Sequence, residues 1–293
     1  ANLRVLPLLA YRFEISDIAL ARPRMVVTRK TDGSSNWSAI LLTLLDQFKS
    51  RIERSSSFSE IRIQDGELIY RDEARDRTEL IQDIDISLAW PSIARSFGAT
   101  GQVIWRDKRI DASITVGDFL AALAGQRSSL KLRLNNPAFK VAFDGTFAAK
   151  PDIMMEGALS VGSSALRDTL QWLGHPPPSD GGFERFTLAS TIQMVGTTVN
   201  LTKTNLDIDG NVAEGALSLN LQERLNIQGT LAADAIDLSP YLSSARAPSA
   251  TSDWSRASFK YAPLDRYDLD LRCSAARVTL GTQKIGRTAV AAN

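Results

Sequence analysis

Apolar and polar residues alternate along most of this chain, which is the pattern of β-strands with one buried face and one solvated face. In residues 58–72, for example, Ile61 and Ile63 point to one side and Arg62 and Gln64 to the other. Further alternating segments follow, many of them separated by turn residues. The clearest lie at residues 78–90, 101–116, 129–134, 139–161, 186–206, 217–231 and 267–280. We therefore predict a mainly β protein built as a long antiparallel meander.

Asp-Gly pairs interrupt the alternation and predict where the chain turns, because both residues tolerate positive φ. Asp65-Gly66, Asp144-Gly145 and Asp209-Gly210 are such pairs. On this basis residues 58–72 and 139–161 each read as a β-hairpin. A further hairpin is expected about Asp107-Lys108.

Only a few short segments have the three-and-four spacing of a helix. The longest is predicted at residues 37–49, after the turn at residues 31–36. Its apolar positions are Trp37, Ile40, Leu41, Leu44, Leu45 and Phe48. Shorter helical turns are expected at residues 118–123, 164–173 and 237–242. These helices are too few to cover the apolar face of a long sheet.

A segment rich in proline and glycine, residues 175–182, is the strongest candidate boundary, since such a sequence continues neither a helix nor a central strand. We expect an N-terminal β-segment at 1–174 and a continuation of the meander at 183–293. The alternative of one continuous domain stays open.

The alternation predicts that one face of the sheet is apolar, but it does not say what covers that face. Either the sheet curls on itself, or something outside the chain fills it. Twelve strictly alternating apolar residues are the candidates for this face: Ile61, Ile63, Leu68, Ile84, Ile86, Leu88, Leu130, Leu132, Leu134, Leu217, Leu219 and Leu221.

Composition narrows the function classes. The chain has 34 Lys and Arg against 33 Asp and Glu, a net charge of +1, which disfavours a nucleic-acid binder. The single cysteine, Cys273, rules out an intrachain disulfide. No apolar run approaches the ~20 residues of a membrane helix, and no signal peptide is visible. The first residues resemble mid-domain sequence, so we expect a fragment of a longer protein.

No catalytic constellation is apparent, so we predict no enzyme and no cofactor. The single histidine, His175, lies in the proline-rich segment without a nucleophile motif nearby, and His and Cys are too few for a zinc site. Three acidic pairs remain: Asp83/Asp85, Asp207/Asp209 and Asp268/Asp270. A glycosidase pair or calcium site is conceivable there, but the solvent face of a strand explains them more simply.

Four motifs in this order resemble the AsmA family of Gram-negative envelope proteins. The first is the turn before the long helix, with Asp32, Gly33, Asn36 and Trp37, and the second is the Ile61–Asp72 segment with Asp65 and Gly66. The third is Leu206–Gly210 followed by Gly215–Leu219, and the fourth is Leu231–Leu242. Together they span about residues 11–245.

The resemblance implies a periplasmic protein anchored in the inner membrane by an N-terminal helix, which this chain lacks. Such proteins are similar to bridge-like lipid transfer proteins, in which a long curved β-sheet forms a taco-like groove. That groove takes up phospholipid acyl chains for transport towards the outer membrane or for its homeostasis. Exposed sheet edges would also suit pairing with other envelope proteins.

Two alternatives are kept open. The chain could be a structural factor for outer-membrane protein assembly, with a closed interior and no lipid conduit. It could also be a carbohydrate-acting enzyme that uses the paired aspartates, for which Asp83 and Asp85 are the residues to substitute.

Overall fold

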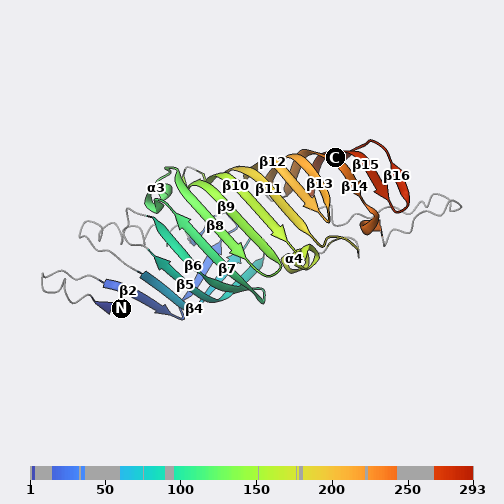
Figure 1. The fold of residues 1–293 in the computed structure, drawn as a ribbon. Coiled ribbons are helices and arrows are strands. Elements are labelled where there is room, and N and C mark those ends of the chain that lie inside the picture. Colours follow the sequence, from blue (N-terminus) through green and yellow to red (C-terminus); the bar gives the residue numbers. More distant parts are fainter. Residues whose placement is uncertain are drawn as a thin grey trace. The chain divides into compact units, whose positions relative to one another are not determined.

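A computed structural model describes residues 2–3, 15–32, 34–36, 60–74, 76–89, 96–150, 152–175, 177, 181–221, 224–242 and 267–292. The protein is mainly β, as the alternation predicts. It forms two compact units, Ala1–Asn136 and Pro137–Asn293. Each unit holds an open, curved sheet (Figure 1). The pairings among the described strands close neither sheet.

In the first unit, β2 (Ile15–Ala21) and β3 (Arg24–Arg29) lie end to end and both run parallel to β4 (Glu60–Asp72). The next four strands follow as antiparallel neighbours: β5 (Arg77–Ala89), β6 (Phe97–Trp105), β7 (Lys108–Val116) and β8 (Ser128–Asn135). A short helix, α3 (Phe119–Leu123), joins β7 to β8, and β1 (Asn2–Leu3) pairs with β2. Asp118 caps α3 by accepting a hydrogen bond from the Ala121 amide at 2.9 Å, as its place in the sequence predicts.

The second unit begins with β9 (Phe139–Ala148) and β10 (Met154–Ser163), followed by α4 (Leu166–Leu173). Four strands then run as an antiparallel meander: β11 (Phe186–Val195), β12 (Thr198–Ile208), β13 (Asn211–Leu221) and β14 (Leu225–Asp237). After the 3₁₀ turn η1 (Ser239–Leu242), β15 (Tyr267–Leu280) pairs in parallel with β14. β16 (Gln283–Ile285) and β17 (Thr288–Ala292) pair with β15.

Three parallel pairings correct the prediction of a purely antiparallel meander. They join β2 to β4, β3 to β4 and β14 to β15, so both sheets are mixed. Parallel neighbours need a long crossover, which the alternation of single strands does not reveal.

The hairpin predicted at 58–72 is wrong. The hairpin predicted at 139–161 is confirmed as the antiparallel pair of β9 and β10, but its turn does not lie at Asp144-Gly145. Asp65 and Gly66 lie inside the single strand β4, where Asp65 has a φ of 51° and forms a β-bulge against β5. Asp144 and Gly145 lie inside β9 and pair with β10. The predictions for Asp107 and Asp209 are correct, because each residue lies in the turn between two paired strands. The helices predicted near 118–123 and 164–173 are also confirmed, whereas the helix at 37–49 lies outside the described residues apart from its approach at Asn36.

The division between the two units falls at Asn136 and Pro137 and not in the proline- and glycine-rich segment at 175–182. That segment, together with α4, connects β10 to β11, which are direct neighbours over their whole lengths. The proline- and glycine-rich segment therefore belongs to the connection between two neighbouring strands and does not separate two domains.

Bulges and one close glycine pair bend the strands. Asp65, Asp83 and Lys203 have positive φ at register shifts in β4, β5 and β12. Gly145 faces Gly157 across β9 and β10, and a Cβ atom on Gly157 would lie 2.4 Å from the Asp144 carbonyl oxygen. Bulges and glycine kinks are the ordinary devices that curve a sheet.

Candidate functional site

One face of the first unit's sheet is apolar from strand to strand. The registers place Ile61, Leu88, Ala99, Ile114 and Leu132 in one row across β4 to β8. The next row has Ile63 beside Ile86 and ends at Leu134 on β8. All nine predicted face residues of this unit share this side: Ile61, Ile63, Leu68, Ile84, Ile86, Leu88, Leu130, Leu132 and Leu134.

The second unit has an apolar face of the same kind. One row crosses seven strands without a polar residue: Phe147, Met155, Met194, Val199, Leu219, Ile227 and Leu269. The predicted residues Leu217, Leu219 and Leu221 all lie on this side of β13, with Leu221 at the strand end and 45% exposed.

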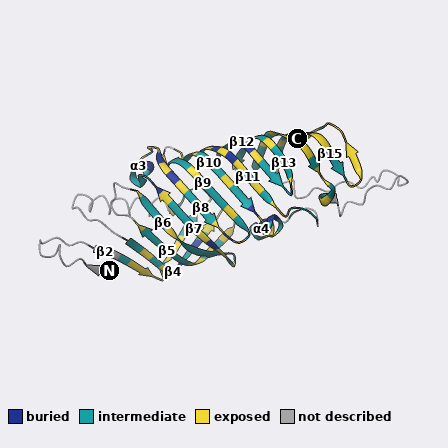
Figure 2. Cartoon of the chain, in the orientation of Figure 1, coloured by how far each residue is buried: buried dark blue, intermediate teal, exposed yellow. Residues whose placement is uncertain are grey.

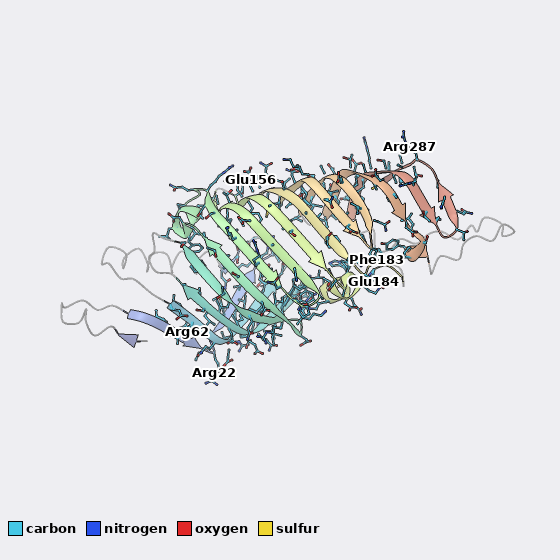
Figure 3. All side chains as sticks on the ribbon, in the orientation of Figure 1. Arg22, Arg62, Glu156, Phe183, Glu184 and Arg287 are labelled. Carbon is cyan, nitrogen blue, oxygen red and sulfur yellow. The ribbon has the colours of Figure 1, made fainter. Side chains whose placement is uncertain are left out.

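The opposite side of the second unit is polar. The row next to the apolar one reads Thr146, Glu156, Gln193, Asn200, Ser218, Gln228 and Asp270. Figure 2 shows the resulting stripes of exposed and less exposed residues along the strands, and Figure 3 labels Glu156 on this polar side. The two rows differ in the side of the pleat they occupy, so along them the second unit separates apolar from polar side chains.

Among the described residues, helices meet the apolar faces only near strand ends. In the first unit Phe119 of α3 stacks on Phe97 of β6 with ring centroids 5.4 Å apart. In the second unit Trp172 of α4 stacks on Phe139 of β9 at the same distance. Elsewhere most residues of both faces are half-buried, which shows that the neighbouring side chains shield them only in part.

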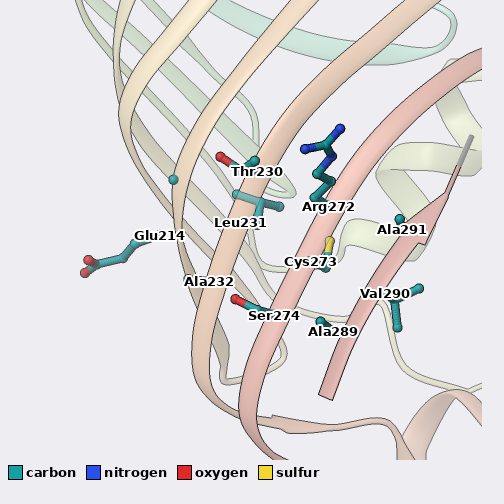
Figure 4. A pocket seen from close by; sticks show the side chains of 11 residues that line it. Glu214, Thr230, Leu231, Ala232, Arg272, Cys273, Ser274, Ala289, Val290 and Ala291 are labelled. Carbon is teal, nitrogen blue, oxygen red and sulfur yellow. The ribbon is translucent and has the colours of Figure 1, made fainter. Parts of the chain in front are cut away.

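Curvature deepens the middle of the second unit's face. Phe143 is 2% exposed and Leu201 is 4% exposed, although they lie on the side of the sheet that carries the half-buried row. In Figure 4 the strands bend, and Glu214 of the polar face points outwards from the convex side of the bend. The apolar side chains therefore lie on the inner side, where bending brings them together.

A cavity of about 490 Å³ lies among β13, β14, β15 and β17 (Figure 4). Its lining includes four residues of the apolar face, namely Gly215, Leu231, Cys273 and Val290. Cys273 has no disulfide partner and is half-buried. It therefore provides one native thiol from which this face can be probed.

Residues of the acidic pairs take part in structural contacts within the described ranges. Asp83 is a bulge residue, while Asp85 accepts hydrogen bonds from the Asp65 amide at 3.0 Å and from Gln102 at 3.1 Å. Asp268 pairs with Arg224 at 3.2 Å. In the described structure these carboxylates therefore contribute to bends and strand ends.

Asp209 organises one end of the second unit. Its carboxylate accepts hydrogen bonds from the amides of Phe183, Glu184 and Arg185 at 2.6–2.8 Å and from the Tyr241 hydroxyl at 2.7 Å. Figure 3 labels Phe183 and Glu184 beside α4. Burial raises the pKa of the Asp209 carboxyl, but these donors outweigh it and hold the pKa below its ordinary value. We call Asp209, Tyr241 and residues 183–185 the Asp209 cluster.

The contacts of the Asp209 cluster predict that Tyr241 ionises at a higher pH than an ordinary tyrosine. Burial and the hydrogen bond to Asp209 raise the pKa of Tyr241 from 10.0 to about 12. Because the folded value lies above the unfolded one, the contribution of this phenol to stability is complete below pH 10.0 and is lost as the pH rises towards 12. An ultraviolet titration should show a phenol ionising near pH 12 that disappears in Tyr241→Phe. A wild-type titration indistinguishable from that of the variant would contradict this assignment.

The residues of the AsmA-like motifs that lie in the described ranges make structural contacts. The Asn36 side chain accepts from the Thr28 amide at 2.9 Å and donates to the Val26 carbonyl at 2.9 Å, so it occupies the outer edge of β3 where another strand would pair. Asp32 accepts from the Ser34 amide at 2.8 Å within the turn. Gly33 and Trp37 lie outside the described residues.

Sequence reasoning missed a polar group at one end of the first unit's face, formed by Tyr70, Arg77, Glu79, Trp105 and Arg106. Tyr70 and Glu79 face each other in the register, and they lie on the same side of the sheet as Leu68 and Ile81. Glu79 occupies a position of β5 where the alternation calls for an apolar residue, and this exception is visible in the sequence.

Within the described ranges, no group of three or more potential ligands could hold a metal ion. No helix in those ranges has the length and apolarity needed to cross a membrane. Comparison with protein-family models, with curated proteins and with solved structures gives no match. The resemblance to the AsmA family therefore rests on the motif residues alone.

Proposed function

We propose that the apolar faces of this protein bind the acyl chains of phospholipids. The observation that supports this proposal is the unbroken apolar row across seven strands of the second unit, with no described second layer over its middle. Each methylene that leaves water on such a surface contributes about 0.8 kcal/mol, whichever molecule supplies the contact. An acyl chain fits this chemistry because it needs no hydrogen-bond partner along its length.

On this proposal, and on the AsmA resemblance, the chain is the periplasmic part of a protein anchored in the inner membrane. It would accept phospholipid on its apolar faces and pass it towards the outer membrane, while the polar faces stay in contact with water. No catalytic step is needed for such transfer, so the protein would act as a binding and transport protein and not as an enzyme.

Charge substitutions on the two sides of one strand test the proposal. Leu132 lies on the apolar face of β8, and Lys131 is its exposed neighbour on the polar face. Leu132→Glu should reduce the phospholipid carried by the purified protein at least tenfold, because a carboxylate there would be desolvated by an acyl chain. Lys131→Glu should leave the bound lipid unchanged. Native mass spectrometry and extraction of fluorescent phospholipid from vesicles measure the difference.

The second unit offers the same comparison with Leu217→Glu and Ala216→Glu on β13. Circular dichroism should first show that each variant retains the strand content of the wild type. A polarity-sensitive fluorophore on Cys273 should shift to the blue when phospholipid is added. If the delipidated wild type takes up no phospholipid, or if all four variants take up as much as the wild type, the acyl-binding function is wrong and a role in protein assembly becomes the better explanation.

A further inference from the structure

The apolar face of the first unit ends in an aromatic and cationic cluster. The register places Leu68, Ile81 and Trp105 in one row across β4, β5 and β6. One step further towards the strand ends, Tyr70 lies opposite Glu79. Arg106 follows Trp105 in the turn to β7 and has a φ of 49°. We call Tyr70, Arg77, Glu79, Trp105 and Arg106 the Trp105 cluster.

Hydrogen bonds hold Arg77, Trp105 and Arg106 of this cluster around Glu79. The Glu79 carboxylate accepts from the Trp105 indole at 2.9 Å, from Nε of Arg106 at 3.0 Å and from Nε of Arg77 at 2.6 Å, and Nη2 of Arg106 also bonds to it. The Arg106 guanidinium lies over the Trp105 ring, 5.0 Å from its centroid. The side chains of Arg106 and Glu79 are 24% and 17% exposed, so both are largely shielded from water.

Two guanidinium groups share the Glu79 carboxylate in this cluster. Asp72 faces Arg77 in the register and is paired with Arg29 at 3.8 Å, so three guanidinium groups and two carboxylates leave one excess positive charge. The turn itself adds Asp107 and Lys108, whose charges are opposite. Guanidinium groups bind phosphate through planar, paired N–H donors, and a tryptophan that is apolar at one end and polar at the other suits the boundary between acyl chain and head group.

The other end of the same face is apolar and covered. There Phe97 stacks on Phe119 of α3, and Val116 and Ala122 are 2% and 0% exposed. From Phe97 to Trp105 along β6 the distance is about 26 Å at 3.3 Å per residue. One leaflet of a bilayer has a hydrocarbon thickness of about 15 Å, half of the ~30 Å core, so an acyl chain that spans one leaflet fits between the two ends.

We propose that the Trp105 cluster binds the phosphate of an anionic phospholipid whose acyl chain lies on the apolar face and points towards α3. This inference rests on the proposed acyl-binding function and adds a head-group class and a direction to it. Glu79 fixes both arginines in place, and the phosphodiester balances the excess charge.

Calorimetric titration of the delipidated full chain tests this inference with three ligands, each below its micelle-forming concentration. Lysophosphatidylglycerol carries a phosphodiester, the monoacylglycerol of the same chain length lacks it, and glycerol phosphate lacks the acyl chain. We expect lysophosphatidylglycerol to bind at least tenfold more tightly than the monoacylglycerol, and glycerol phosphate alone not to bind. Arg77→Gln with Arg106→Gln should remove the tenfold preference and leave the monoacylglycerol affinity unchanged.

The matched control is Arg109→Gln with Arg133→Gln, which removes the same charge from exposed positions on the polar face of β7 and β8. It should keep the preference. Arg106→Lys retains the charge without the planar fork and should show an intermediate preference, which separates phosphate binding from a loss of folding. Equal wild-type affinity for the two acyl ligands, or an equal loss in the control, overturns the head-group site while leaving acyl binding intact. No binding of either acyl ligand instead overturns the proposed function itself.

Discussion

Gly157→Ala is expected to lower the free energy of unfolding of the second unit by about 3 kcal/mol. A Cβ atom there would lie 2.4 Å from the Asp144 carbonyl oxygen and 2.5 Å from the Gly145 Cα, both of them backbone atoms of β9. Neither atom can move without shifting a strand that is paired over its whole length. Backbone strain and overpacking of this kind cost about 1–3 kcal/mol each. Urea unfolding followed by circular dichroism measures the loss.

Gly162→Ala in the same strand is the matched control. The nearest atom to a Cβ at that position is the Phe186 carbonyl oxygen at 3.8 Å, an ordinary contact. Its free energy of unfolding should stay within about 0.5 kcal/mol of the wild type. Hydrogen exchange should show faster opening of β9 and β10 in Gly157→Ala alone. Equal stability of the two variants would mean that the close approach of these strands does not require glycine.

Asp209→Ala should destabilise the same unit by about 3 kcal/mol, because it removes the acceptor of three backbone amides and the Tyr241 hydroxyl at once. Asp209→Asn keeps one acceptor oxygen and should lose roughly half as much. The pKa of Asp209 lies below its ordinary value of 3.8, so the contribution of this carboxylate is present above that pH and is lost as the pH falls below it.

Asp234→Ala is the control for charge, since Asp234 is an exposed carboxylate on β14 of the same unit. Its thermal midpoint should match the wild type at neutral pH. The difference between Asp209→Ala and wild type should shrink as the pH falls below the ordinary carboxyl pKa, because the unfolded wild type then binds a proton that the folded carboxylate takes up only at lower pH. A gap between the two midpoints that does not change with pH would show that Asp209 stabilises the unit by packing and not by its charge.

The two-residue period of the sequence identified the sides of the strands well. Ile61, Leu88 and Leu132 are far apart in the chain, yet each was assigned to an apolar side, and the registers put all three in one row. This works because consecutive side chains of any strand point to opposite faces, so the assignment needs no knowledge of the neighbours.

The polar ends of the faces were not predictable in the same way. Glu79 lies 26 residues from Trp105 and 27 from Arg106, and only the pairing of β5 with β6 brings them together. The same holds for Asp209 and Tyr241, which are separated by 32 residues. Contacts of this range depend on register and on turn geometry.

By itself the sequence determined that the protein is mainly β, which residues share the apolar side of each strand, and where α3 and α4 form, because these follow from local periodicity and capping. Only the tertiary structure decided that Asp65 bends a continuous strand while Asp209 ends one, and that β4 and β14 each have a parallel neighbour. A residue with positive φ can form either a bulge or a turn, so the residue type alone does not distinguish the two. The partner strand decides between them, since a bulge keeps the backbone hydrogen bonds of a long ladder and a turn gives them up.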